Sequence, residues 1–285
     1  MRVRHAFTVD VEDWFQVANL MHLIDRSEWD DMELRVVRNT DRLLALLGDR
    51  GVRGTFFTLG WVAEKEPGLV RRIAEQGHEI ASHGWEHSLV GTLGPDGFRA
   101  DVARTKAVLE DTAGVEVRGF RASTWTICED TLWALDVLLE EGYRYDSSIF
   151  PVRHPDYGLP GAPRLPHRRT TPAGAEISEF PPLTWKVLGR TVGAGGGGYL
   201  RMLPMALTKA AFRARGRDGA PGCLYVHPWE VDPDQPLPEA FKGIGRFRHT
   251  VRLDRTEERL ATLLDEFAFG PMGDVLDEWE ATARA

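Results

Sequence analysis

Short runs of β-branched and aromatic residues recur along the chain and alternate with stretches in which apolar residues follow a helical period. Seven of these runs predict β-strands, at residues 6–9, 54–58, 79–82, 117–120, 143–145, 176–180 and 223–226. Helices are predicted at 39–51, 62–74, 98–109, 130–139, 204–214 and 256–267, the first with Asn39 and Thr40 as its N-terminal cap. Strands that alternate with helices are typical of an α/β fold with a parallel sheet, either open or closed into a barrel.

Three segments depart from this alternation. Residues 151–174 are rich in proline and poor in apolar residues, so they predict a long irregular loop of the kind that often carries function. Gly193 and Gly195–Gly198 form a glycine cluster ending at Tyr199, which is either a flexible surface turn or a place where backbone approaches a ligand closely. After Asp232, a proline-rich stretch and the last predicted helix indicate an extension that covers the main fold.

Composition narrows the class of protein. Of the 285 residues, 42% are apolar and 27% are charged, which is ordinary for a globular protein. The net charge of -8 argues against a nucleic-acid binder, because neutralising phosphates needs a surplus of lysine and arginine. The chain shows no apolar run long enough for a membrane helix and no signal peptide, so we expect a cytoplasmic protein. Its two cysteines, Cys128 and Cys223, offer neither a disulfide framework nor a thiolate metal cage.

Two histidines four residues apart, His83 and His87, follow the third predicted strand. If a helical turn begins there, this spacing brings both imidazoles to one face, where such pairs bind divalent metal well. Histidines of the surface or of the core are the alternative for a pair taken alone. The position favours a metal site, because α/β folds place their sites at the carboxyl ends of strands.

Three carboxylates, Asp10, Glu12 and Asp13, follow the first predicted strand. Carboxylates crowded into four residues repel one another, and a bound cation removes that cost. A solvated acidic turn is the alternative. If the strand continues through this segment, Asp10 and Glu12 point the same way because side chains alternate along a strand. One of them could then bind metal while its neighbour acts as a base.

Polar side chains follow three further predicted strands. His227 precedes Pro228, which favours an extended conformation, so its imidazole projects from a strand end. Arg121 follows the fourth predicted strand and Asp146 follows the fifth. Each residue alone is more often structural than functional. Five strand ends that each present a polar group together predict a single site.

These segments resemble the motifs of the NodB-homology polysaccharide deacetylases, the fourth carbohydrate esterase family. Within that family the chain is most similar to the subgroup found beside exopolysaccharide and exosortase loci. The matching segments are 9–15, 54–57, 145–148, 196–199, 227–230, 247–249 and 269–272, in consistent order along nearly the whole chain. The resemblance implies a distorted seven-stranded (β/α) barrel in residues 1–235, with residues 236–285 as a C-terminal extension packed on the same domain.

The resemblance also implies a metal site. His83 and His87 match the metal-binding histidines of the family, and Asp10 matches its catalytic base. The third ligand is expected to be Glu12, with Asp13 as the alternative. Nitrogen and oxygen donors suit Zn²⁺ best, and they also suit Mn²⁺, Fe²⁺ and Co²⁺.

Further residues of the family's site match other positions. Arg121 corresponds to the arginine that orients the base, His227 to the general acid, and the backbone N–H of Thr124 to the oxyanion donor. Ser123 stands where the family usually has a proline. Residues expected to contact substrate, the tryptophans by stacking on a sugar ring, are Trp125, Asp146, Trp229 and Tyr199.

The function implied is metal-assisted hydrolysis of an N-acetyl group on an amino sugar of a polysaccharide or glycan precursor. Hydrolysis of a small-molecule amide or formamide on the same fold is the closest alternative. Two alternatives belong to other classes. Two histidines and one carboxylate also form the facial triad of non-haem iron oxygenases, although those usually have a β-rich scaffold. A non-catalytic glycan-binding relative would be expected to have lost Asp10 or His227, and both are present. The sequence leaves the oligomeric state open.

Overall fold

The structure, a computed structural model, describes residues 3–187 and 189–283 and centres on seven parallel strands. Their spatial order is β10, β1, β2, β3, β4, β5 and β7. The bounds are β1 Arg4–Val11, β2 Thr55–Thr58, β3 Glu79–Ser82, β4 Gly119–Phe120, β5 Tyr145–Asp146, β7 Glu176–Glu179 and β10 Cys223–Val226. Every predicted strand corresponds to one of these seven, so the predicted α/β fold is confirmed.

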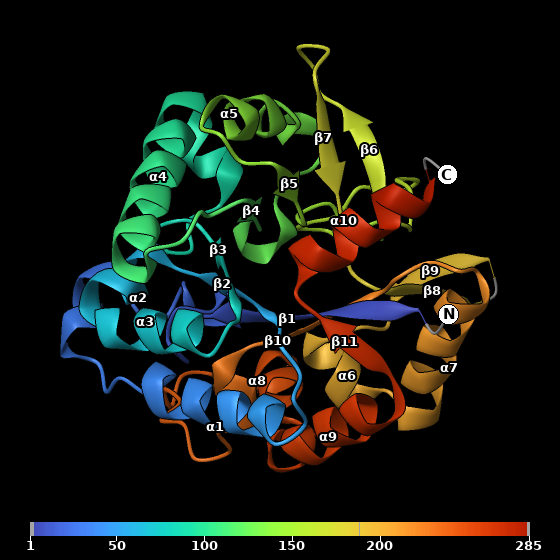
Figure 1. Cartoon of the computed structure of the whole chain (residues 1–285). Helices are drawn as coiled ribbons and strands as arrows, with labels where there is room; N and C mark the ends of the chain where they lie inside the picture. Colours follow the sequence, from blue (N-terminus) through green and yellow to red (C-terminus); the bar gives the residue numbers. More distant parts are fainter. Residues whose placement is uncertain (1–2, 188, 284–285) are drawn as a thin grey trace.

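Ten α-helices of the described residues lie around this sheet, as Figure 1 shows. Their bounds are α1 Val36–Gly48, α2 Gly60–Lys65, α3 Pro67–Glu75, α4 Val90–Ala113, α5 Ala134–Glu140, α6 Gly197–Met202, α7 Met205–Arg217, α8 Gly243–Thr250, α9 Thr256–Glu266 and α10 Met272–Ala283. Helices α6, α8 and α10 were not predicted. No described helix is both long and apolar enough to cross a membrane.

Two predicted helix boundaries are wrong. Helix α1 begins at Val36, so Asn39 and Thr40 lie inside it and do not cap it. The single helix predicted at 62–74 is two helices, α2 and α3, with Pro67 between them. Proline has no N–H to donate and disfavours a helical conformation at the preceding residue, and Glu66 accordingly has φ -126° and ψ 56°.

The barrel closes without a direct ladder between its outermost parallel strands. Among the described residues, β7 and β10 form no ladder with each other, and the segment 180–196 joins them instead. Leu183 N–H donates to the carbonyl of Cys223 at 3.1 Å, and Tyr225 N–H donates to the carbonyl of Gly195 at 2.8 Å. The barrel is therefore distorted at this point, because single hydrogen bonds from irregular backbone replace a regular strand pairing with β10.

Four further strands, none of them predicted, accompany the barrel. β6 (His167–Thr170) runs antiparallel to β7 and occupies part of the proline-rich segment that was predicted to be irregular. β8 (Thr184–Val187) and β9 (Arg190–Gly193) form a separate hairpin, and β11 (Ala268–Gly270) runs parallel to β1.

The C-terminal helix α10 fills the end of the barrel at which the strands begin. Met272, Val275 and Leu276 pack against apolar side chains of β1, β2 and β3. The backbone N–H of Met272 donates to Thr55 Oγ1, and the N–H of Gly273 donates to Glu79 Oε2. Because this end is filled, only the carboxyl ends of the strands remain free to carry a site.

The glycine cluster packs against β10. A Cβ atom at Gly196 would lie 2.1 Å from the carbonyl oxygen of Tyr225, and one at Gly195 would lie 2.5 Å from that of Cys223. These two glycines therefore permit the backbone contact that closes the barrel, and they are not a flexible turn. Gly197 and Gly198 line a cavity described below.

Replacing Gly196 by alanine should destabilise the fold by about 1–3 kcal/mol, because the added methyl meets backbone that cannot move aside. The matched control is Gly216→Ala in α7, where a Cβ meets no atom within 4 Å and alanine favours the helix. Urea unfolding of both variants measures the difference. Equal free energies of unfolding for Gly196→Ala and the wild type would contradict this account of barrel closure.

Candidate active site

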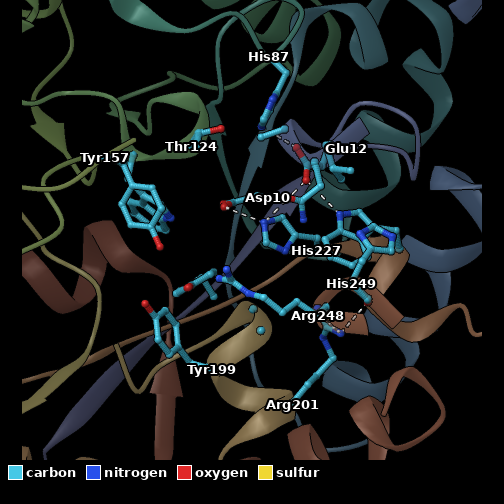
Figure 2. Close-up of a pocket in the computed structure, with 18 of the residues that line it drawn as sticks. Asp10, Glu12, His87, Thr124, Tyr157, Tyr199, Arg201, His227, Arg248 and His249 are labelled. Atoms are coloured by element: carbon cyan, nitrogen blue, oxygen red, sulfur yellow. Dashed lines mark hydrogen bonds and ion pairs between the residues drawn. The ribbon is translucent and has the colours of Figure 1, made fainter. Parts of the chain in front are cut away.

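A cavity of about 190 Å³ lies at the carboxyl ends of the strands. Figure 2 shows that its labelled side chains come from both halves of the chain. Nine of the predicted residues line it: Asp10, Glu12, His83, His87, Thr124, Trp125, Tyr199, His227 and Trp229. Arg121 lies directly behind it, whereas Asp13 and Asp146 are directed elsewhere.

Glu12, His83 and His87 are brought together at one end of the cavity. All three are buried, and one ligand atom of each lies within 4.8 Å of the others. Glu12 Oε2 lies 2.9 Å from His87 Nε2. His83 Nδ1 lies 2.8 Å from the carbonyl of Arg121. Since a carbonyl only accepts, Nδ1 of His83 carries the hydrogen and Nε2 keeps its lone pair for a ligand.

The donor atoms of this cluster fit a divalent metal ion. His87 Nδ1 is buried and makes no hydrogen bond within the described residues, which is costly without a bound partner. Burial lowers the pKa of His83 to about 4, which keeps its imidazole neutral. Burial raises the pKa of Glu12, but the charges of His87 and His227 outweigh this and hold it well below its usual range. One carboxylate and two imidazoles are a common zinc donor set.

The loop that carries both histidines is fixed by backbone hydrogen bonds. Gly60 N–H donates to the carbonyl of Gly84, and Trp61 N–H donates to the carbonyl of Trp85, both at 2.9 Å. Trp85 N–H donates in turn to Asp101 Oδ1 on α4 at 3.0 Å. His87 has φ 60°, an uncommon value for a residue other than glycine. The loop is therefore held in one conformation by its neighbours.

Asp10 forms a buried ion pair with Arg121. Arg121 Nη1 lies 2.5 Å from Asp10 Oδ1 and donates also to Thr8 Oγ1. The other donors of the guanidinium reach Ser147 and the sulfur of Cys223. Arg121 is 0% exposed, so its charge and that of Asp10 stabilise each other without water.

Asp13 does not join the metal cluster, which corrects the alternative left open above. Its Oδ1 accepts from Trp14 N–H, and its Oδ2 accepts from the N–H groups of Arg35 and Val36. Three backbone donors thus hold the carboxylate at the start of α1, a position that a helix N-terminus favours for an anion. Burial still raises the pKa of Asp13, to about 6, despite these hydrogen bonds.

Asp146 is not among the residues that line the cavity, contrary to its predicted contact with substrate. It is fully buried and accepts from the hydroxyl and the N–H of Ser148. The hydroxyl of Ser148 in turn accepts from Ala122 N–H at 2.7 Å. Burial raises the pKa of Asp146 and also that of the adjacent Glu179. Asp146 therefore supports the loop after Arg121 from behind.

His227 is held by a relay that begins at Arg201. Its Nδ1–H donates to Glu230 Oε1 at 2.7 Å, and Glu230 Oε2 accepts from Arg201 Nε at 2.7 Å. Its Nε2 lies 3.7 Å from Asp10 Oδ2 and 3.7 Å from Glu12 Oε1. Burial lowers the pKa of His227, but Glu12, Glu230 and Asp10 more than offset this and raise it to about 9. In the metal-free protein these carboxylates therefore favour the protonated imidazole.

The aromatic residues divide into two groups. Trp229 Nε1 donates to Glu12 Oε1 at 3.0 Å while its ring lies between those of His227 and His249. This tryptophan thus orients a carboxylate as well as lining the cavity. Figure 2 shows Tyr157 and Tyr199 across the cavity from His227 and His249, and Trp125 belongs to the same cluster as these two tyrosines.

The loop after β4 has an uncommon backbone conformation. Thr124 and Trp125 have φ values of 54° and 57°, and with His87 they are three of the four non-glycine residues with positive φ in the described chain. Such conformations persist only where surrounding structure enforces them, and they cluster at functional sites. Here Ser123, the residue at the usual proline position, donates from its hydroxyl to the carbonyl of His83 at 3.4 Å.

Sequence reasoning missed several residues of the site. Glu230 and Arg248 lay in matching segments but received no role, although a carboxylate three residues after His227 signalled a partner for it. Asp101, Arg201 and Tyr157 lie outside the segments that match the family. Only the folded chain brings these three to the cavity or to the loops that form it.

Two family models match the chain. Residues 27–145 match polysaccharide deacetylase, and residues 147–277 match a domain of unknown function, DUF3473. A peptidoglycan-N-acetylglucosamine deacetylase of Bacillus cereus is 35% identical over 98 residues, which are 34% of this chain and 36% of that protein. The match thus spans about a third of the length of this relative.

Solved structures with the same fold cover nearly the whole chain. A Mycobacterium smegmatis protein assigned to the polysaccharide deacetylases superposes with a TM-score of 0.63 at 23% identity, covering 99% of this chain and 91% of the other. An allantoinase superposes with a TM-score of 0.62 at 16% identity and the same two coverages. At these identities the likeness establishes the fold.

Replacing Asp101 by asparagine should stabilise the metal-free protein at pH 8 and leave it unchanged near pH 4. Burial raises the pKa of Asp101 to about 7, whereas an unfolded chain has an ordinary aspartate, so ionisation costs the wild type stability as the pH rises from about 4 to 7. Asparagine keeps the acceptor for Trp85 N–H and removes this loss, roughly 2–4 kcal/mol at pH 8. Thermal unfolding across this pH range measures it. A gain that does not depend on pH would contradict the assignment.

Proposed function

The chain carries a polysaccharide deacetylase domain, as the resemblance implied, and from this premise we propose that it removes an N-acetyl group from an amino sugar of a glycan or glycan precursor. The reaction is proposed to depend on a divalent metal ion. The observation that carries the proposal is the convergence of three groups on one cavity: the cluster Glu12, His83 and His87, the ion-paired Asp10, and the protonated His227.

Glu12, His83 and His87 would hold the metal ion. Zn²⁺ is the first choice for this donor set, and Mn²⁺, Fe²⁺ and Co²⁺ share its ligands. When bound, such an ion polarises a carbonyl oxygen and lowers the pKa of a bound water. Trp229 keeps Glu12 oriented through its indole N–H, and Arg121 keeps His83 oriented through its carbonyl.

Asp10 is proposed to accept the proton of the attacking water. Arg121 occupies Oδ1, which leaves Oδ2 facing His227 and the cavity. The buried guanidinium pairs with the carboxylate and fixes its direction, so the base is ready without rearrangement.

His227 is proposed to protonate the leaving amine. An amide nitrogen does not leave as an anion, so a proton must reach it as the carbon–nitrogen bond breaks. Glu230 and Asp10 favour the protonated imidazole, and Glu230 fixes the tautomer by accepting from Nδ1–H. The proton therefore sits on Nε2, the nitrogen that faces Asp10 and Glu12.

The loop at Thr124 is proposed to stabilise the negative oxygen of the tetrahedral intermediate through its backbone N–H. Thr124 lines the cavity, and the strained conformation of this residue and Trp125 presents the loop to the substrate. Trp125, Tyr157 and Tyr199 offer aromatic faces for a sugar ring.

Other functions fit the site less well. The allantoinase fold match keeps hydrolysis of a small amide as the second candidate, and the aromatic wall favours a sugar over it. An oxygenase needs neither the ion pair at Asp10 nor the acid at His227. A binding protein has no use for a buried base and acid in one cavity.

Metal analysis tests the ligand set. His83→Ala, His87→Ala and Glu12→Gln should each lower zinc affinity at least about tenfold, because each removes a donor or its charge. Asp13→Asn is the matched control. It should keep the metal, since its carboxylate binds the start of α1 and not the cluster. Elemental analysis after dialysis and zinc titration give the result, and loss of metal in Asp13→Asn with retention in Glu12→Gln would overturn the assignment.

Two substrates whose leaving groups differ in their need for a proton test the role of His227 as the acid. His227→Ala should slow acetate release from an N-acetyl sugar by about 10² to 10⁴-fold, whereas hydrolysis of an aryl acetate, whose leaving group departs unprotonated, should fall far less. Bound metal should remain. Rates on both substrates, measured with metal-loaded protein, give the answer. Equal losses on both would show that His227 positions substrate and does not act as the acid.

A further inference from the structure

Helix α8 exposes two large apolar side chains to solvent. Ile244 is 74% exposed and Phe247 is 57% exposed, the highest values among the exposed large hydrophobic residues of the described chain. They are three residues apart on a helix of eight residues, so they lie on the same side of it. Solitary apolar residues on a surface are ordinary, but a pair of this size on one helix face suggests something that covers it.

This apolar pair lies beside the proposed active site. Arg248 follows Phe247 on the same face, four residues after Ile244, and it lines the cavity. Figure 2 shows the side chain of Arg248 in the cavity together with His249 and Arg201. Ile244 and Phe247 are not among the lining residues, but they stand on the same helix as Arg248 and His249, which are.

The opposite side of α8 is fixed to the protein. His249 is buried, hydrogen bonded to Gln235 and stacked on Trp229. Arg201 Nη1 donates to the carbonyls of Arg248, His249 and Val251. The exposed pair therefore stands on a rigid element, and its exposure does not come from a loosely packed loop.

The charge around the pair is positive. Lys242, Arg246, Arg248 and Arg252 are exposed, and the chain has no carboxylate between Lys242 and Leu253. The side chain of Arg248 makes no hydrogen bond or ion pair with a described residue. This local surplus of cations contrasts with a net charge of -8 for the whole chain.

We propose that α8 docks the mouth of the cavity on an anionic lipid surface. Apolar side chains on one face, flanked by lysine and arginine, are the composition of helices that lie in the interface of a bilayer. Anionic headgroups neutralise the four cations, and the acyl boundary removes Ile244 and Phe247 from water. Resting on the proposed function, the inference extends to substrate class: the N-acetyl sugar is carried by a glycan at the membrane surface.

Vesicle co-sedimentation tests the docking. The full chain should bind vesicles of phosphatidylcholine with phosphatidylglycerol, bind vesicles of phosphatidylcholine alone far less, and lose binding as salt rises. Ile244→Ser with Phe247→Ser should lower the partition coefficient at least about tenfold. Lys242→Gln with Arg246→Gln should weaken binding only to the anionic vesicles. The matched control, Val115→Ser with Leu207→Ser, replaces exposed apolar residues elsewhere and should bind like the wild type.

Three results would overturn the docking proposal. One is wild-type binding that does not distinguish anionic from neutral vesicles. Another is full binding by the Ile244 and Phe247 variant. The third is a wild-type protein that does not bind vesicles but forms a dimer in solution, with the dimer lost in this variant. The exposed face would then bind a second copy of the chain.

Acetate release from a soluble N-acetylated oligosaccharide separates this inference from the proposed function. The Ile244 and Phe247 variant should release acetate at the wild-type rate, because neither side chain lines the cavity. Vesicle binding without any acetate release would refute the proposed function and leave the docking intact. Acetate release without vesicle binding would refute the docking alone.

Discussion

The guanidinium of Arg121 lies in the middle of the barrel with no access to water, and the rest of the site depends on how its charge is met. A buried cation is tolerated only where a counter-ion and enough acceptors surround it. Asp10 supplies the charge, while hydroxyl and carbonyl oxygens from β1 and the segment after β5 satisfy the remaining donors. The carbonyl of the same arginine fixes the ring of His83. One residue thus orients both the proposed base and a proposed metal ligand.

The cavity also joins the two halves of the chain. The half matched to polysaccharide deacetylase supplies His83, His87 and the loop of Thr124. The half matched to the domain of unknown function supplies His227, and it also supplies the Glu230 and Arg201 that hold this histidine. The segment that precedes both matches carries Asp10 in β1 and Glu12 directly after it. No segment alone contains a complete set of groups for the proposed reaction.

Much of the fold and of the candidate site could be predicted from the sequence. The parts that could not be predicted depend on contacts between distant residues. The strands were predictable because buried parallel strands are short apolar runs, and a parallel sheet brings their carboxyl ends to one edge. The sequence placed Asp13 and Asp146 near the site but could not show their contacts. A position beside a strand end does not reveal whether a carboxylate binds backbone N–H groups or faces the cavity. Asp13 meets three N–H groups at the start of α1, and Asp146 meets Ser148. The relay through Arg201 was not predictable, since its partners are carbonyls far along the chain.

The C-terminal elements constrain the order in which the chain can fold. β11 pairs with β1 from Arg4 opposite Ala268 to Ala6 opposite Gly270, and α10 enters the barrel beneath β2 and β3. β1 therefore waits for β11, a strand far along the chain, before its pairing is complete. Contacts between such distant residues slow folding, because a long loop must close before they form. During synthesis, the apolar interior of the barrel stays open at the end where the strands begin, until α10 emerges to fill it.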